Sequence, residues 1–175
     1  MIKRVGLALM LISSVMISAK DCKYEDINNK SDVHEWSIPK DCISLDLSES
    51  DIDDEDAKKL ATAMKENKNI KLTNLILANN NIGYKGVKEL AAVLNKNKTL
   101  TQLDLTNNNI GDKGVKELAA ALNKNKTLTS LNLFYSQIRD EGAKELAAAL
   151  NKNKTLTWLN FRANEIGYLG AKELA

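Results

Sequence analysis

LTQLDLTNNNIGDKGVKELAAALNKNKT, residues 100–127, is the stretch that decides the fold, because it recurs almost unchanged at residues 128–155. Weaker or shortened forms of the pattern occur three more times in the chain. One leucine of each strand marks the period, at intervals of 28 residues: Leu75, Leu103, Leu131 and Leu159. A fixed period of this length is typical of stacked supersecondary units. The chain is therefore an array of five units, the last of them cut short.

Each unit has two halves with different periods. The first half, L-x-x-L-x-L, alternates with a period of two and predicts a short strand with its leucines on one face. The second half places apolar residues at helical spacing between Val115 and Leu122 and predicts an amphipathic helix. Asp112 stands just ahead of this helix, so we expect it to act as the N-cap.

A single strand and helix of this kind cannot bury its own leucines, so the units must stack on one another. Consecutive strands then run parallel in one sheet, about 4.8 Å apart, and the wider helices form a second layer. This difference in width bends the stack with its strands inside. The pattern predicts an α/β fold, a curved solenoid with a concave parallel sheet and convex helices. At 175 residues, the chain is long enough to bury a sizeable core.

The pattern that starts at Leu100, L-x-x-L-x-L-x-x-N-x-I-G-x-x-G-V-x-x-L-A-x-x-L, resembles the leucine-rich repeats of the ribonuclease-inhibitor type. The resemblance covers residues 42–175 and implies a horseshoe that binds other proteins on its inner face. It does not imply ribonuclease inhibition, because the chain is far shorter and lacks that inhibitor's alternation of repeat types.

The resemblance also implies a structural role for one asparagine per unit, whose side chain turns inward and bonds to the loop backbone. The matching positions are Asn80, Asn108 and Asn164. Ser50 and Ser136 replace this asparagine in units one and four, and we expect those two turns to be held less firmly.

Residues 1–19 have the features of a secretory signal peptide. Lys3 and Arg4 are followed by an apolar run, and Ala19 offers a small residue at the cleavage point. An uncleaved membrane anchor is the alternative, and a lipoprotein signal is a weaker one because Asp21 precedes Cys22. We therefore expect a secreted, periplasmic or cell-surface protein with no stable membrane span after cleavage.

Residues 20–41 carry no repeat and precede the first strand, so we interpret them as the terminal cap that an open solenoid requires. Cys22 and Cys42 flank this segment. In an exported chain, two cysteines at this spacing are expected to form a disulfide, which stabilises by about 3 kcal/mol. The alternative is a pair of free or buried thiols in a reducing compartment.

The charge balance gives no indication of nucleic-acid binding. The chain has 25 basic and 23 acidic residues, and removal of Lys3 and Arg4 with the leader leaves 23 of each sign. The charge is unevenly divided along the chain, however. Residues 20–72 hold 9 basic and 14 acidic side chains, whereas residues 73–175 hold 14 and 9.

Catalytic and metal-binding patterns are missing from the sequence. The one histidine, His34, has no nucleophile to pair with and is expected on the cap surface. The acidic run from Asp51 to Asp56 lacks the glycine and distal glutamate of a calcium loop, and it suits a helix N-terminus. We therefore predict no enzyme activity, no metal and no cofactor.

Three N-K-T tripeptides match the glycosylation sequon; they begin at Asn97, Asn125 and Asn153. We expect them on exposed loops, and we interpret them as copies of the repeat.

The predicted concave face changes character toward the C-terminus. Its outward positions are polar in units two and three and become large in units four and five. The candidate binding residues are Asp104, Asn132, Phe134, Tyr135, Trp158, Asn160 and Arg162. Aromatic residues and arginine are favoured at interface centres, and on adjacent strands they would lie about 5 Å apart. The alternative is that Trp158 and Phe134 shield an uncapped end or meet a missing neighbour.

The prediction for function is a non-enzymatic protein–protein interaction module that holds a protein ligand, of unknown identity, on its concave face. One alternative is a regulator of another enzyme, either an inhibitor or an activator. Another is a truncated copy of a longer repeat protein, since the sequence stops at Ala175 within the helix of unit five.

Overall fold

The leucines of consecutive units form the rungs of one parallel sheet. We analysed a computed structural model, which describes residues 20–27, 36–67 and 70–174; the predicted signal peptide and His34 lie outside these ranges. Leu75 pairs with Leu103, Leu103 with Leu131, and Leu131 with Leu159, each in a parallel register. The predicted stacking of units is therefore confirmed.

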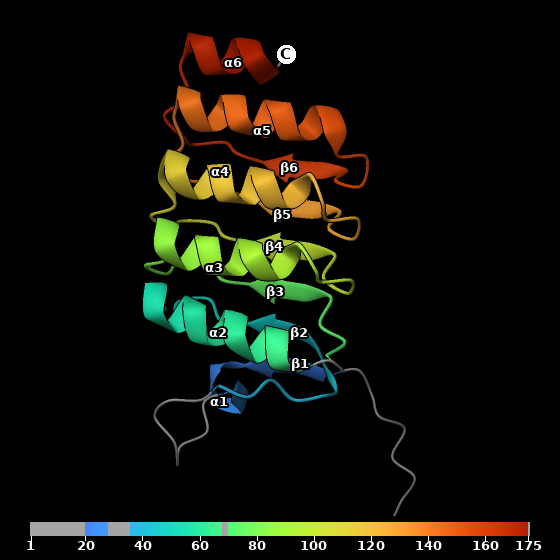
Figure 1. The fold of residues 1–175 in the computed structure, drawn as a ribbon. Coiled ribbons are helices and arrows are strands. Elements are labelled where there is room, and N and C mark those ends of the chain that lie inside the picture. The colour runs from blue at the N-terminus through green and yellow to red at the C-terminus, as the bar shows by residue number, and fades with distance from the viewer. Residues whose placement is uncertain (1–19, 28–35, 68–69, 175) are drawn as a thin grey trace, which may run out of the picture.

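Strands and helices alternate along the chain, and the six strands lie in sequence order in the sheet (Figure 1). The strands are β1 Lys20–Lys23, β2 Cys42–Asp46, β3 Asn74–Ile76, β4 Gln102–Asp104, β5 Ser130–Asn132 and β6 Trp158–Asn160. The helices are α1 Tyr24–Ile27, α2 Asp54–Glu66, α3 Tyr84–Leu94, α4 Gly111–Leu122, α5 Asp140–Lys152 and α6 Tyr168–Leu174.

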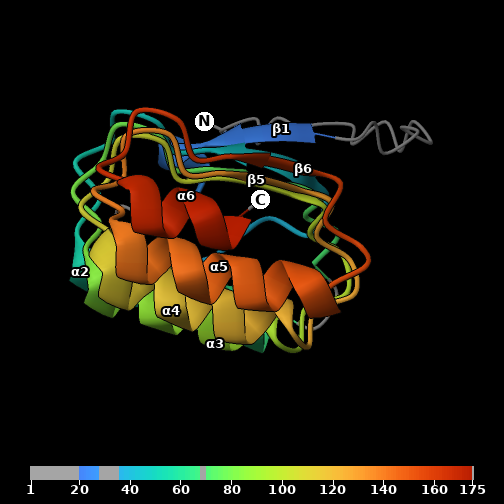
Figure 2. The ribbon, with the colours of Figure 1, turned by 90° about the horizontal axis from the view of Figure 1, so that it is seen from above.

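The molecule has two layers, with helices α2 to α6 covering one face of the sheet (Figure 2). The core lies between the layers, where the inward leucines of the strands meet the apolar stripes of the helices. Leu45, Leu75 and Leu131 are almost completely buried on the strand side, as are Leu60 and Leu118 on the helix side. The predicted α/β solenoid, with an open curved sheet and an outer layer of helices, is the observed fold.

The segment before the first repeat adds a strand to the sheet. β1 pairs with β2 in a parallel register, and Ile27, Trp36 and Ile38 are buried in the same core as the leucines. The Cα atoms of Cys22 and Cys42 are 5.9 Å apart, which is within the range that a disulfide spans, and both side chains are buried. This geometry is compatible with the predicted disulfide.

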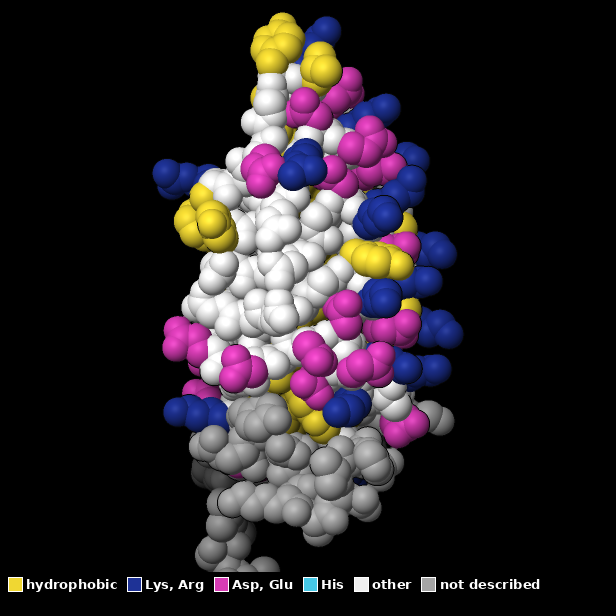
Figure 3. All heavy atoms as spheres, turned by 90° about the vertical axis from the view of Figure 1, so that its left-hand side faces the viewer, with side chains coloured by type: hydrophobic (Ala, Val, Ile, Leu, Met, Phe, Trp, Pro, Cys, Tyr) yellow, Lys and Arg dark blue, Asp and Glu magenta, His cyan; other side chains and the backbone are white. Residues whose placement is uncertain are grey.

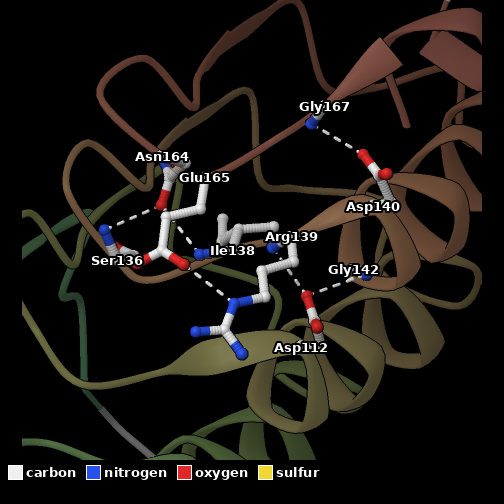
Figure 4. A network of polar contacts seen from close by, with 9 residues as sticks. All are labelled: Asp112, Ser136, Ile138, Arg139, Asp140, Gly142, Asn164, Glu165 and Gly167. Carbon is white, nitrogen blue, oxygen red and sulfur yellow. Dashed lines mark hydrogen bonds and ion pairs between the residues drawn. The ribbon is translucent and has the colours of Figure 1, made fainter. Parts of the chain in front are cut away.

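An acidic residue in the first turn of one helix caps the helix of the next unit. Asp112 Oδ1 accepts hydrogen bonds from the backbone N–H groups of Arg139 (2.8 Å) and Gly142 (3.0 Å) (Figure 4). Asp140 does the same for Gly167 and Gly170. The prediction that Asp112 caps its own helix is therefore wrong, since α4 begins one residue earlier, at Gly111.

This arrangement explains one glycine of the repeat. A Cβ atom on Gly142 would lie 2.6 Å from Asp112 Oδ1, and one on Gly170 would lie 2.7 Å from Asp140 Oδ1. No side chain fits between the helix backbone and the carboxylate that caps it. The glycine is thus a consequence of close contact between units.

The repeat asparagines also act across units. Asn164 Oδ1 accepts from the backbone N–H groups of Ser136 and Ile138 in the preceding unit (Figure 4), and Asn164 Nδ2 donates to carbonyl groups of both units. Asn80 binds the preceding turn in the same way, and Asn108 donates its amide to Leu77 O and accepts from Ile82 N–H.

The serine replacements therefore weaken a different turn from the one expected. The turn at Ser136 is held by Asn164, and the turn at Ser50 is held by Asn80. The turn that loses an asparagine is the one before Ser136, in unit three. The capping acid for this unit is also missing, because Tyr84 occupies its position. Here Gly111 adopts φ +60° and donates its N–H to Ser136 O instead.

The asparagines of the three N-K-T tripeptides are structural rather than exposed. Asn125 and Asn153 are buried, and each donates its amide to a helix carbonyl of the preceding unit, Leu94 O and Leu122 O respectively. Asn97, Asn125 and Asn153 all accept from the backbone at the start of the next strand. The expectation of exposed sequons is wrong at Asn125 and Asn153, because both side chains are needed inside the stack.

Candidate binding surface

The outward side chains at the ends of three neighbouring strands form a polar row. Asp104, Asn132 and Asn160 occupy equivalent positions on β4, β5 and β6. Each accepts a hydrogen bond from the backbone N–H two residues further on, as Asn132 Oδ1 does from Phe134 N–H at 3.2 Å. Asn132 Nδ2 also donates to Asp104 Oδ2. These three candidates therefore have a structural task that sequence reasoning missed, and part of their polar capacity is already used.

The four large side chains do not lie together on adjacent strands as expected. Phe134 and Tyr135 follow β5, and Tyr135 N–H donates to Arg162 O, so these three residues meet at the carboxyl ends of the strands. Trp158 opens β6 and pairs with Ser130. It lies four residues before Arg162, about 13 Å away along the strand. Phe134, Tyr135 and Arg162 form one group, which we call the aromatic corner, and Trp158 stands apart.

All four side chains are exposed. Phe134, Tyr135 and Trp158 are 38%, 58% and 50% accessible, in contrast to the buried leucines beside them. Two further exposed aromatic residues, Tyr84 and Tyr168, lie at the starts of α3 and α6 on the helix side. In Figure 3 the exposed hydrophobic groups on the edge of the strand-to-helix turns are separate from one another. The candidate surface is a small group of side chains rather than a continuous apolar patch.

Tyr135 has an unfavourable backbone conformation. Its φ is +51°, in the left-handed region that glycine and asparagine tolerate best. The equivalent positions in units two and three are Asn79 and Asn107, with φ of +56° and +51°. The side chains of Asn107 and Asn79 bond to each other, whereas that of Tyr135 is exposed. Units one and five also lack asparagine here, with Glu49 at φ +54° and Ala163 at φ +56°, and unit four carries a large aromatic side chain at this position.

A polar row along the strand-to-helix turns was missed by sequence reasoning. Asn109 Nδ2 donates to Asn81 Oδ1, and Gln137 Nε2 donates to Asn109 Oδ1. Next to it, Arg139 Nε donates to Glu165 Oε2 at 2.8 Å (Figure 4). This hydrogen bond, with the charge of Glu165, raises the pKa of Arg139, which stays protonated. The 28-residue spacing of these positions is the signal that could have found them.

The described residues contain no group of three or more potential metal ligands, and no helix among them is long and apolar enough to cross a membrane. A groove of about 630 Å³ opens between the C-terminal halves of α2 and α3, lined among others by Met64, Ile70 and Val93. It lies on the helix side, where Lys96 and Lys98 also line it, away from the candidate surface.

Parallel strands in register, each followed by a helix on the outer face, define a solenoid of the binding-module class. The chain belongs to the leucine-rich repeat family. The family model "Leucine Rich repeat" matches residues 43–61, 68–91, 96–119, 124–147 and 152–175, which is more than half of the sequence. A comparison with curated proteins finds no match.

Among solved structures, the chain is similar to one described as "Leiomodin-1 Actin-Binding Site 2 (ABS2)". The identity is 29% and the TM-score 0.63, and the match covers 74% of this chain and 73% of the other. Leucine-rich repeats are typical of protein–protein interaction modules, and this neighbour is an actin-binding site. Both findings point to a non-enzymatic interaction module.

Proposed function

We propose that this protein is an exported leucine-rich repeat protein of the ribonuclease-inhibitor type, which binds a protein ligand on its concave side. The aromatic corner is its contact surface, with Trp158 and the row of Asp104, Asn132 and Asn160 at its side. The single observation that carries this proposal is Tyr135. A large exposed side chain in a left-handed conformation costs stability, and strain of this kind is concentrated at functional sites.

The composition of the corner supports a protein as the ligand. Phe134 and Tyr135 can bury a large apolar area at low entropic cost, and Arg162 can pair with a carboxylate. The pair Arg139–Glu165 lies in the same two units and adds one charge of each sign beside the corner. A protein surface offers the mixed apolar and charged groups that such a corner fits.

The test is a binding assay with a triple variant, Phe134→Ala, Tyr135→Asn and Arg162→Gln. Actin is the first defined probe, because the structural neighbour is an actin-binding site. Proteins captured from the extracellular fraction and identified by mass spectrometry form the second set of probes. We expect the variant to lose at least tenfold in affinity for the bound protein, since interface hot spots contribute about 2 kcal/mol or more.

The matched control is Tyr84→Ala with Tyr168→Ala, which removes two exposed aromatic side chains from the helix side. Binding should be unchanged in this control, which should melt near the wild-type temperature, and the triple variant should melt at or above that temperature. Unaltered binding by the triple variant, or an equal loss in the control, would exclude the aromatic corner as the contact surface.

Export is tested by intact mass measurement of the protein recovered outside the cell. We expect a chain that begins at Lys20 and is two hydrogen masses lighter than its reduced form, because Cys22 and Cys42 are joined. A chain that retains residues 1–19 inside the cell, with two thiols that react with iodoacetamide, would refute export.

A further inference from the structure

One long edge of the stack carries only basic charges in three of its turns, and acidic charges gather in one turn of the opposite edge. The strand-to-helix turn of unit one, from Asp46 to Asp56, contains seven acidic side chains and no basic one. The helix-to-strand turns of units two, three and four lie on the opposite edge and read N-K-N-K-T. They contain six lysines and no acid: Lys96, Lys98, Lys124, Lys126, Lys152 and Lys154.

The six lysines are exposed and available for contact. Within the described part of the chain none of them takes part in an ion pair, whereas Lys58, Lys59, Lys116 and Arg139 all do. Among the described contacts of these six side chains, the hydrogen bond from Lys154 Nζ to Asn151 O, at 3.0 Å, is the only one. The asparagine between each pair of lysines is held in the stack, as described for Asn125 and Asn153. The lysines therefore extend from a fixed backbone in one row.

We propose that this lysine edge, defined by the six lysines above, docks the protein on an anionic lipid surface. Because the turns repeat in register, the six ammonium groups lie along one side of the stack, where a flat surface can meet all of them at once. Lys96 and Lys98 also help to line the groove between α2 and α3, and the turns contain no aromatic side chain. Lysine ammonium groups are point charges that suit lipid phosphate and carboxylate groups without a shaped pocket.

Charge separation makes this docking possible for a protein that is nearly neutral as a whole. The two edges are one helix length apart, roughly 18 Å for helices of this size. Charges are screened within about 8 Å at physiological ionic strength. The acidic turn of unit one therefore does not cancel the attraction between the lysine edge and an anionic surface. When the lysine edge contacts such a surface, the acidic turn lies on the opposite edge of the stack. The concave side stays free, so this docking does not depend on the proposed protein ligand.

The structural alternative is that these lysines only stabilise the helix C-termini. Basic residues in the last turn interact favourably with the helix dipole, by roughly 0.3–1 kcal/mol each. This effect requires one lysine per helix, and Lys96, Lys124 and Lys152 are placed for it. The second lysine of each turn lies beyond the helix: Lys98, Lys126 and Lys154. The helix dipole does not explain why these positions are basic.

The test is co-sedimentation of the wild-type chain with vesicles of phosphatidylcholine alone and of phosphatidylcholine mixed with phosphatidylserine. The variant changes Lys98, Lys126 and Lys154 to Gln. We expect binding to the mixed vesicles only, and its loss at high salt. Each lysine near an anionic surface contributes about fivefold, so the triple variant should bind about a hundredfold more weakly. Its circular-dichroism melting curve should match the wild type.

The matched control removes the same charge elsewhere, as Lys85→Gln, Lys88→Gln and Lys144→Gln, three exposed lysines on the helices. It should retain most of the vesicle binding, as should the aromatic-corner variant. Equal losses in both lysine variants would show a general charge effect and overturn the proposal. An absence of binding to the mixed vesicles would also overturn the proposal. In that case, binding of soluble polyphosphate, or salt-sensitive self-association, that is lost in the lysine-edge variant would identify the actual partner of the edge. If only the binding of the protein ligand on the concave side is lost, the proposal of lipid docking is unaffected.

Discussion

At the scale of the residue, the left-handed position after the strand is filled by an asparagine in units two and three and by Tyr135 in unit four. Asn79 and Asn107 fill the left-handed position after the strand, and their side chains bond to each other. Tyr135 holds the same backbone conformation without a suitable side chain. Tyrosine suits this conformation less well than asparagine does, and we propose that it serves binding.

This argument predicts that Tyr135→Asn stabilises the protein. Asparagine tolerates φ near +51° better than tyrosine, and here it can reach Asn107, so the free energy of unfolding should rise by about 1 kcal/mol. Urea unfolding followed by circular dichroism measures the change. The reciprocal substitution, Asn107→Tyr, should lower it by at least as much. If Tyr135→Asn has no effect or is destabilising, the conformation of Tyr135 is not strained, and the main support for the corner is lost.

At the scale of the element, the starts of α5 and α6 depend on the preceding unit. The acid and the helix that it caps come from different units, and so do the asparagine and the turn that it holds. Local sequence patterns predict a strand or helix well, because alternation and helical spacing are contained within one unit. They cannot tell a cap for the same helix from a cap for the next one, since an acid in the first turn satisfies both patterns. Asp112 was assigned to the wrong helix for this reason.

The consequence can be tested with Asp112→Ala. The substitution leaves the N–H groups of Arg139 and Gly142 without their acceptor, so it should cost about 1–2 kcal/mol of unfolding free energy. Glu141→Ala is the control, because Glu141 lies in the first turn of α5 and is exposed. It should change stability by less than about 0.5 kcal/mol. Amide exchange should speed up at Gly142 in the first variant only; faster exchange in the first turn of α4 instead would restore the local cap.

At the scale of the whole molecule, the stacking of units in register places equivalent residues of successive repeats side by side on one surface. Each residue of the N-K-N-K-T turn is copied to the same edge, and the acids of unit one gather on the other. Counting charge along the chain found an acidic and a basic half, but it could not find these edges. The paired leucines, by contrast, could be predicted, because their period alone sets the rungs. The aromatic corner could not be predicted, because Trp158 opens β6 whereas Arg162 lies two residues beyond the end of that strand.

Stacking also means that the stability of a rung depends on having neighbours on both sides. Leu131 is fully buried between β4 and β6, whereas Leu159, on the last strand of the described sheet, is only partly buried. Leu131→Ala should therefore cost about 3 kcal/mol of unfolding free energy, and Leu159→Ala about 1 kcal/mol. Urea unfolding of both variants measures the difference, and native-state hydrogen exchange should show β6 opening before β4 in the wild type. Equal losses would mean that Leu159 is as well buried as Leu131, and simultaneous exchange of β6 and β4 would mean that the stack opens as one cooperative unit.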